Sequence, residues 1–364
     1  MTRLPEPHEV CPSKGRLEGL DLARCLAIFA MVYVNYEVVL AFGVKEPFWM
    51  RSLASAFEGR ASALFVMLAG IGLTMLNCPR SIFRRGVFLL VFGYLWQVVW
   101  PGDILHFYAF YLFAGAAVLK CSAKALLFFA LLVTLGFLAM FNLLDYGAGW
   151  DWLNLEYTSF WEPSGQIRNL FFNGWHPLFP WLAFLFVGMA LGKWGIAEEK
   201  KCRKALLWSA IVFLVVSVAS NFLSQLEDNR PPFEKIDFWY KSPESLFGTD
   251  SLPPVPGYVI SAGASSVFIM AICLELGRRE ILKKYLQPLV VTGQFALSLY
   301  IAHILFLYGG DLNPSPGTEL STAGWRALYF CVFALLFANL WPRRWRKGPL
   351  EYLMRLTTKP DKAR

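Results

Sequence analysis

The chain has 364 residues, of which 56% are hydrophobic, 16% aromatic and only 16% charged. Soluble domains usually carry about a quarter charged residues, so this composition excludes an ordinary soluble enzyme and predicts an all-α membrane protein. The formal net charge of +8 comes from basic clusters between the apolar segments. Because such clusters orient membrane helices, the charge does not argue for nucleic acid, and we expect no nucleic-acid partner.

The apolar segments are long enough to cross the hydrocarbon core of a membrane, which takes roughly 17–25 residues per helix. They predict about ten transmembrane helices. In chain order the predicted spans are 18–42, 61–77, 86–100, 104–120, 124–142, 177–196, 204–224, 257–277, 286–309 and 324–341. The third and fourth spans are short and are separated by only a few residues, so we expect them to form a tight helical hairpin.

The chain divides into an arm (1–17), a membrane domain (18–341) and a basic tail (342–364). With the N-terminus in the cytoplasm, 26 of the 34 basic residues fall on the cytoplasmic side, as the positive-inside rule requires. The same alternation places both termini in the cytoplasm and two acidic loops, 143–176 and 225–256, outside. The dense aromatic content of the first loop favours a packed lid over a disordered segment.

None of the seven cysteines lies in a predicted outer loop, so we expect no disulfide framework there. No CxxC or Cys/His spacing indicates a metal site. Glycine-rich nucleotide loops and the HExxH pattern are also missing, so an ATPase, a dehydrogenase or a zinc peptidase has no support. We therefore expect no metal.

Ionisable residues inside membrane spans are costly and are candidates for function. Three of the four histidines fall near the outer ends of spans. His106 is the first candidate for a general base, because Asp103, three residues earlier, can hold one ring nitrogen while the other takes up a proton. His176 is the second candidate, and Arg60 is the candidate for stabilising developing charge. For each histidine the alternative is a hydrogen-bonded packing role.

Other polar residues at the same depth are candidates for binding the acceptor substrate: Asn35, Glu37, Trp175, Tyr300 and His303. On the inner side, arginine clusters are suited to bind the phosphates of a cytoplasmic coenzyme. These arginines are Arg80, Arg84, Arg85, Arg278 and Arg279. The alternative is that they only orient the helices. In the first span, the spacing of Asp21 and Arg24 predicts a structural ion pair.

Several motifs together resemble a known group of membrane proteins. They are Arg16–Arg24 with Ala30–Asn35, Gly59–Phe65 with Leu68–Gly70, Asp103–Tyr108, His176-Pro177 with Pro180–Leu182, Gly293-Gln294 with Leu297–Tyr300 and His303, and Gly348–Arg355. These segments resemble the YeiB-like bacterial membrane proteins and the relatives of heparan-α-glucosaminide N-acetyltransferase, within the transmembrane acyltransferase superfamily. The resemblance spans nearly the whole chain in order.

The resemblance implies a ten-helix transmembrane acyltransferase fold, integral to the bacterial inner membrane and surrounded by membrane lipid. It implies an acyl-CoA donor, acetyl-CoA above all, on the cytoplasmic side, and a glycan or other small acceptor on the outer side. Two positions depart from the group. Asn35 stands where related O-acyltransferases carry a histidine, and the loop 43–60 lacks the histidine that the heparan-type enzymes use.

Two other interpretations stay open. A transporter that exports a small metabolite would use the same ionisable residues as a proton relay. Such a protein usually shows inverted repeats and broken mid-span helices, and neither is clear in the sequence. A catalytically inactive relative that binds a lipid or glycan is the third interpretation, favoured by the two missing histidines. The oligomeric state is left open, with a homodimer as one arrangement.

Overall fold

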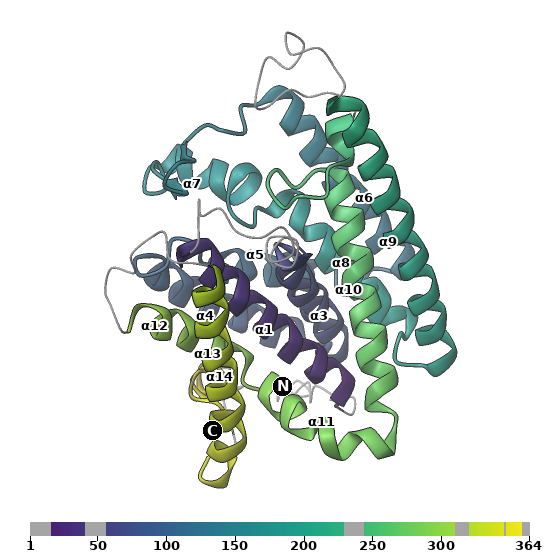
Figure 1. Ribbon diagram of the computed structural model, residues 1–364, viewed down its shortest axis with the longest axis vertical. Helices are drawn as coiled ribbons and strands as arrows, with labels where there is room; N and C mark the ends of the chain where they lie inside the picture. The colour runs from purple at the N-terminus through teal and green to yellow at the C-terminus, as the bar shows by residue number, and fades with distance from the viewer. Residues whose placement is uncertain (1–15, 41–55, 229–243, 310–319, 346, 359–364) are drawn as a thin grey trace, which may run out of the picture.

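The computed structural model describes residues 16–40, 56–228, 244–309, 320–345 and 347–358. The larger part of the predicted arm, residues 229–243 of the loop 225–256 and the end of the predicted tail lie outside the described residues. The described part is almost entirely helical (Figure 1). Its long helices are α1 (Glu18–Leu40), α3 (Arg60–Leu76), α4 (Pro79–Gln97), α5 (Leu105–Ala117), α6 (Ala123–Leu143), α8 (Leu178–Trp194), α9 (Glu199–Asp228), α10 (Pro256–Gly277), α11 (Glu280–Gly293), α12 (Ala296–Tyr308), α13 (Leu320–Leu340) and α14 (Pro349–Thr358). Short helical turns are α7 (Pro163–Arg168), η1 (Asn169–Asn173), η3 (Glu244–Phe247) and η4 (Trp341–Arg343).

Helices occur at the positions of all ten predicted spans. Among the described residues, five helices are long and apolar enough to cross a membrane alone, and two bent helix pairs raise the number to seven. The helices α3 and α5 are apolar but shorter. The chain is thus a mostly helical integral membrane protein, whereas ten crossings and the cytoplasmic location of both termini stay predictions.

The predicted span 286–309 is not one straight helix. It falls on α11 and α12, which meet at an angle of 71°. At the break, a Cβ added to Gly293 would lie 1.8 Å from the carbonyl oxygen of Asp21, so the end of α11 packs directly on the backbone of α1. The first N–H groups of α12 have no acceptor within the helix. Glu351 of α14 supplies one, because its Oε1 accepts from the N–H groups of Leu297 and Ser298 at 2.8 and 3.0 Å. These contacts stabilise a break that costs backbone hydrogen bonds.

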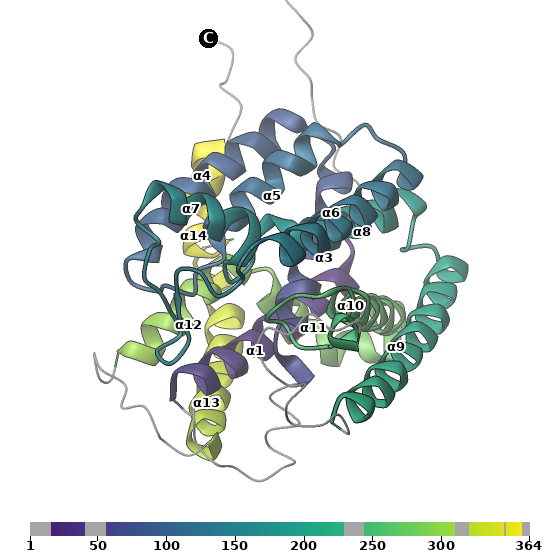
Figure 2. The ribbon, with the colours of Figure 1, turned by 90° about the horizontal axis from the view of Figure 1, so that it is seen from above.

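The helix α1 lies in the centre of the bundle and packs against α3, α10, α11 and α13 (Figure 2). The helix α8 lies between α3 and α6, and α4 pairs with α5 as the predicted hairpin. The contact between α3 and α8 depends on two glycines. A Cβ at Gly70 would lie 2.3 Å from the oxygen of Leu185, and one at Gly188 would lie 2.2 Å from the oxygen of Met67. Small residues at such crossings let membrane helices approach closely.

The segment between α6 and α8 folds over one end of the bundle. It contains the antiparallel strands β1 (Trp150–Asp151) and β2 (Glu156–Tyr157), followed by α7 and η1, and lies opposite α11 and α14 (Figure 1). Asn173 is fully buried and holds it together: its Nδ2 donates to the oxygens of Tyr146 and Ala148, and its Oδ1 accepts from Tyr157. This segment, residues 143–176, is called the lid below.

Candidate active site

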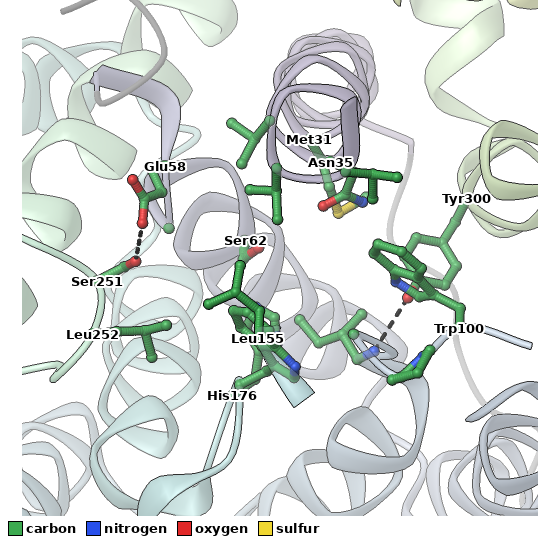
Figure 3. A pocket seen from close by; sticks show the side chains of 18 of the residues that line it. Met31, Asn35, Glu58, Ser62, Trp100, Leu155, His176, Ser251, Leu252 and Tyr300 are labelled. Carbon is green, nitrogen blue, oxygen red and sulfur yellow. Dashed lines mark hydrogen bonds between the residues drawn. The ribbon is translucent and has the colours of Figure 1, made fainter. Parts of the chain in front are cut away.

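A cavity of about 400 Å³ lies under the lid, between α1, the start of α3 and the turn before α5. Asn35, Ser62, His176 and Tyr300 line it and surround one space in Figure 3. The start of α3 comes close to Ser251, because Gly59 has a φ of 65° and a Cβ there would lie 2.5 Å from the Cβ of Ser251. This approach positions Glu58, whose carboxylate accepts from Ser251 Oγ at 3.0 Å (Figure 3). We call this space the outer cavity.

A second cavity, of about 570 Å³, opens toward the other end of the bundle. Arg16, Arg24 and Arg85 line it together with Glu351 of α14. Partial burial and the nearby Arg355, Arg85 and Arg16 lower the pKa of Lys347. Two of these arginines, Arg85 and Arg16, line the cavity itself. We call this space the inner cavity.

The two cavities have four lining residues in common: Met31, Ser62, Ile104 and Tyr300. They come from α1, α3, the turn before α5 and α12. These four residues therefore border both spaces. We call them the partition, because they lie between the cavity under the lid and the basic cavity at the opposite mouth.

Tyr300 is held in this partition by Asp103. Its hydroxyl donates to Asp103 Oδ1 at 3.0 Å and accepts from the backbone N–H of Ile104 at 3.2 Å. Asp103 Oδ2 accepts from the backbone N–H groups of Leu105 and His106 at 2.8 and 3.2 Å. Asp103 thus satisfies the first N–H groups of α5, where a carboxylate is also favoured by the helix dipole.

His106 lies beside Asp103, as predicted from their spacing, with its Nδ1 3.3 Å from Asp103 Oδ2. The ring is buried among Tyr94, Phe107 and Phe160. Its Nε2 has no hydrogen-bond partner in the described part of the chain. His106 is not among the residues that line either cavity. Its role as the base stays a prediction, with no route to an acceptor visible in this arrangement.

His176 lines the outer cavity directly. It lies between η1 and α8, where its backbone oxygen accepts from Tyr111 at 2.6 Å and its ring packs edge-on against Trp181 at 4.5 Å between centroids. Its Nδ1 is buried without a hydrogen-bond partner among the described residues. Of the three histidines predicted at this depth, His176 is the one positioned to contact a molecule under the lid.

The remaining outer candidates separate into two groups. Asn35, Trp175 and Tyr300 line the outer cavity, as expected for substrate-binding residues. Glu37 and Arg60 do not line it. Arg60 instead donates to Ser261 of α10 at 3.4 Å and lies 6.0 Å from the ring of Phe213.

His303 is completely buried behind Asn35 rather than exposed in the cavity. Its Nε2 lies 2.9 Å from Asn35 Nδ2, and its backbone oxygen accepts from the hydroxyl of Tyr36 at 2.9 Å. Asn35 therefore lies between the buried histidine and the cavity. We infer that His303 fixes the orientation of the Asn35 amide.

The predicted inner arginines do not all line one cavity. Of the five, Arg85 lines the inner cavity, and Arg80 and Arg84 do not. Arg278 and Arg279 line a separate surface depression with Glu199, where Arg278 pairs with Glu275. The predicted pair of Asp21 with Arg24 is confirmed.

Several lining residues were missed by the sequence interpretation: Arg16, Arg24 and Glu351 in the inner cavity, and Glu58, Ser62, Trp100, Asn154 and Ser251 in the outer one. Asp21 is fully buried and bridges Arg16 to Arg24, so the ion pair also positions two cations at the inner mouth. A signal for some of them was present, because Arg16, Arg24, Ser62 and Glu351 fall within the motifs that carry the family resemblance. The others come from loops without a pattern of their own.

Comparison with known protein families shows to which family the chain belongs. The model of the catalytic region of heparan-alpha-glucosaminide N-acetyltransferase matches residues 16–224, which include α1, α3, the Asp103 turn and His176. The chain belongs to this family. A second family model, described as a protein of unknown function (DUF418), matches residues 254–360 and so covers α12 and α14.

Two bacterial relatives extend over nearly the whole chain. An uncharacterized protein, YxaH, of Bacillus subtilis (strain 168) is 24% identical over 412 residues, covering 94% of each chain. An uncharacterized 39.9 kDa protein from the amylase 3′ region of Bacillus acidopullulyticus is 23% identical over 367 residues, again covering 94% of each chain. The relationship to the N-acetyltransferase family thus supports a transmembrane acetyltransferase-like function.

Proposed function

We propose that this protein transfers an acetyl group from acetyl-CoA in the inner cavity to a glycan or other small acceptor in the outer cavity. The observation that carries the proposal is the partition of Met31, Ser62, Ile104 and Tyr300, which borders both spaces. A thioester that reaches this partition from the basic mouth would present its carbonyl carbon to an acceptor under the lid. Only the acetyl group would need to pass.

The inner cavity suits the donor. Arg16, Arg24 and Arg85 supply cations for the phosphates of the coenzyme, since arginine binds phosphate through paired N–H donors. Apolar residues of α3, such as Leu73 and Leu76, line the same space and suit the extended arm that ends in the thioester.

The outer cavity suits the acceptor. We assign the general base to His176, because it lines the space in which the acceptor hydroxyl or amine would lie. The base takes the proton as the acceptor oxygen or nitrogen attacks the thioester carbon. The carbon–sulfur bond then breaks, and the thiolate of coenzyme A leaves and takes up a proton. Asn35 has a second amide N–H beyond the one directed at His303 and is the candidate donor to the carbonyl oxygen.

The test uses the full-length protein in detergent with acetyl-CoA and a panel of amino sugars and neutral glycans, with release of free coenzyme A thiol as the readout. We expect acceptor-dependent release for the wild type. His176→Gln should reduce it roughly 10²–10⁴-fold while acetyl-CoA still raises the melting temperature. Full activity of His176→Gln would remove His176 from the mechanism. Binding without release for any acceptor would favour the catalytically inactive relative.

A second candidate function has one specific observation in its favour. The break between α11 and α12 is of the kind found in transporters, and Gly293, Gln294 and Ala296 at the break line the inner cavity. An exporter would move an intact metabolite across the partition without consuming acetyl-CoA. Uptake of acceptor into proteoliposomes in the absence of acetyl-CoA would support export, and its absence, together with thiol release, would support transfer.

A further inference from the structure

A cavity of about 680 Å³ lies between α6, α8, α9 and α10 and shares no residue with the outer or inner cavity. It exists because α9 packs on α10 at the edge of the bundle, away from α6 and α8 (Figure 2). Most of its lining is apolar, including Leu131, Leu135, Val187, Leu191, Val212, Val259, Ile260 and Val267. We call it the side groove.

The few hydroxyl groups in the side groove are already satisfied within their own helices. Thr134 donates to the oxygen of Ala130 at 2.9 Å, and Ser209 donates to the oxygen of Leu206 at 3.1 Å. A ligand in the body of the groove therefore meets no unpaired hydroxyl donor. Hydrocarbon is the chemistry that fits such a surface inside a membrane.

One end of the groove is different. Lys204, Trp194 and Trp208 line it where α8 ends and α9 begins. The neighbouring Lys201 and Arg203 are paired with Glu198 and Glu199, whereas Lys204 has no carboxylate partner in the part of the chain that the structure describes. Exposed tryptophans mark the level of lipid head groups, and an unpaired cation at that level attracts an anionic head group.

The length of the side groove matches the thickness of the hydrocarbon layer in one leaflet of the membrane. On α8 the lining extends from Ala183 to Trp194, which is roughly 16 Å at a rise of about 1.5 Å per residue. The hydrocarbon core is about 30 Å thick, so this is about half of it. A single lipid chain that starts at Lys204 would end near the middle of the membrane.

We infer that the side groove binds one anionic phospholipid, with its phosphate on Lys204 and a hydrocarbon chain between α8 and α9. The lipid replaces the helix contacts that α9 lacks on this side. This site is independent of the acetyl-transfer proposal.

The full-length protein in detergent is titrated with phosphatidylglycerol or phosphatidylcholine and followed by native mass spectrometry. We expect one tightly bound phosphatidylglycerol, and Lys204→Ala should weaken it roughly tenfold or more, because a charge-assisted contact to phosphate is lost. The matched control is Lys284→Ala on α11, which removes the same charge outside the groove. Gly263→Leu should block binding of the chain itself, since a Cβ at Gly263 has only Phe184 nearby, at 3.8 Å.

Equal affinity for both lipids, or unchanged phosphatidylglycerol binding in Lys204→Ala, overturns the proposal. If Gly263→Leu instead changes the number of copies per particle and leaves lipid binding unchanged, the groove is an interface between copies. A cooperative thermal unfolding transition in lipid-free detergent, at the melting temperature of the wild type, checks that each variant is folded.

Discussion

Asn35 Nδ2 lies 2.9 Å from His303 Nε2 and joins α1 to α12 at the wall of the outer cavity. The bond connects a residue that faces the cavity with one that is completely buried. Removing the Asn35 amide would leave His303 Nε2 buried and unsatisfied, which usually costs about 1–3 kcal/mol.

Asn35→Ala should therefore lower the stability of the detergent-solubilised protein by about 1–3 kcal/mol, measured by thermal unfolding. The control is Asn142→Ala, because among the described residues the amide of Asn142 bonds only to the oxygen of Leu138, on an exposed surface. In the double variant Asn35→Ala with His303→Leu, the cost should be smaller than the sum of the single costs. Strict additivity would show that the two side chains do not support each other.

Arg85→Ala should weaken acetyl-CoA binding roughly tenfold or more, since one charge-assisted contact to phosphate is lost. Titration calorimetry on the purified protein measures the affinity. Arg279→Ala is the matched control, because it removes the same charge from the separate surface depression. Equal losses in both variants would mean that general charge, rather than the inner cavity, attracts the coenzyme.

His106→Gln should destabilise the protein but leave acetyl transfer within about tenfold of the wild type, because His106 lines neither cavity. In this arrangement its Nδ1 contacts Asp103 Oδ2, and its ring lies outside both cavities. The thiol-release assay measures the rate, in parallel with His176→Gln. A loss as large as that of His176→Gln, with donor binding intact, would restore the catalytic role predicted from the sequence.

Glu351→Gln should loosen the attachment of α14 to α12. The glutamate accepts from the backbone of Leu297 and Ser298, and a carboxylate at a helix start is worth about 1 kcal/mol more than a neutral group. We expect roughly fivefold faster amide exchange at the start of α12, measured by hydrogen exchange with mass spectrometry. Glu280→Gln, at the exposed start of α11, should leave exchange in α12 unchanged.

The helices were predictable from sequence because apolar length is a strong signal in membranes. The break between α11 and α12 was not, since 286–309 is long and apolar enough to suggest a single span. The break depends on Gly293 meeting α1 and on Glu351, more than fifty residues away. Hydropathy carries no information on either contact.

The candidate site was predictable only in part, because hydropathy shows how deep a residue lies in the membrane but not which way its side chain points. Depth along a span can be estimated from sequence, and it placed Asn35, His176 and Tyr300 correctly near one another. The direction of a side chain cannot be estimated in this way when helices are apolar all round. His106 and His303 therefore had the same appearance in the sequence as His176, although the structure places them behind the cavity wall. The arginine clusters at 80–85 and at 278–279 also looked equivalent in the sequence. In the structure Arg85 lines the inner cavity, whereas Arg278 and Arg279 line a separate surface depression.

The partition of Met31, Ser62, Ile104 and Tyr300 also separates two cavities that open toward opposite ends of the bundle. A membrane that stores a proton gradient cannot contain an open aqueous path, and two cavities that approach each other from opposite ends come close to forming one. The side chains that would let an acetyl group pass must therefore also block the flow of protons and ions between the two cavities. Shortening Met31 and Ile104 together would join the two spaces, and the cost would appear as a leak of protons and ions in cells that produce the protein.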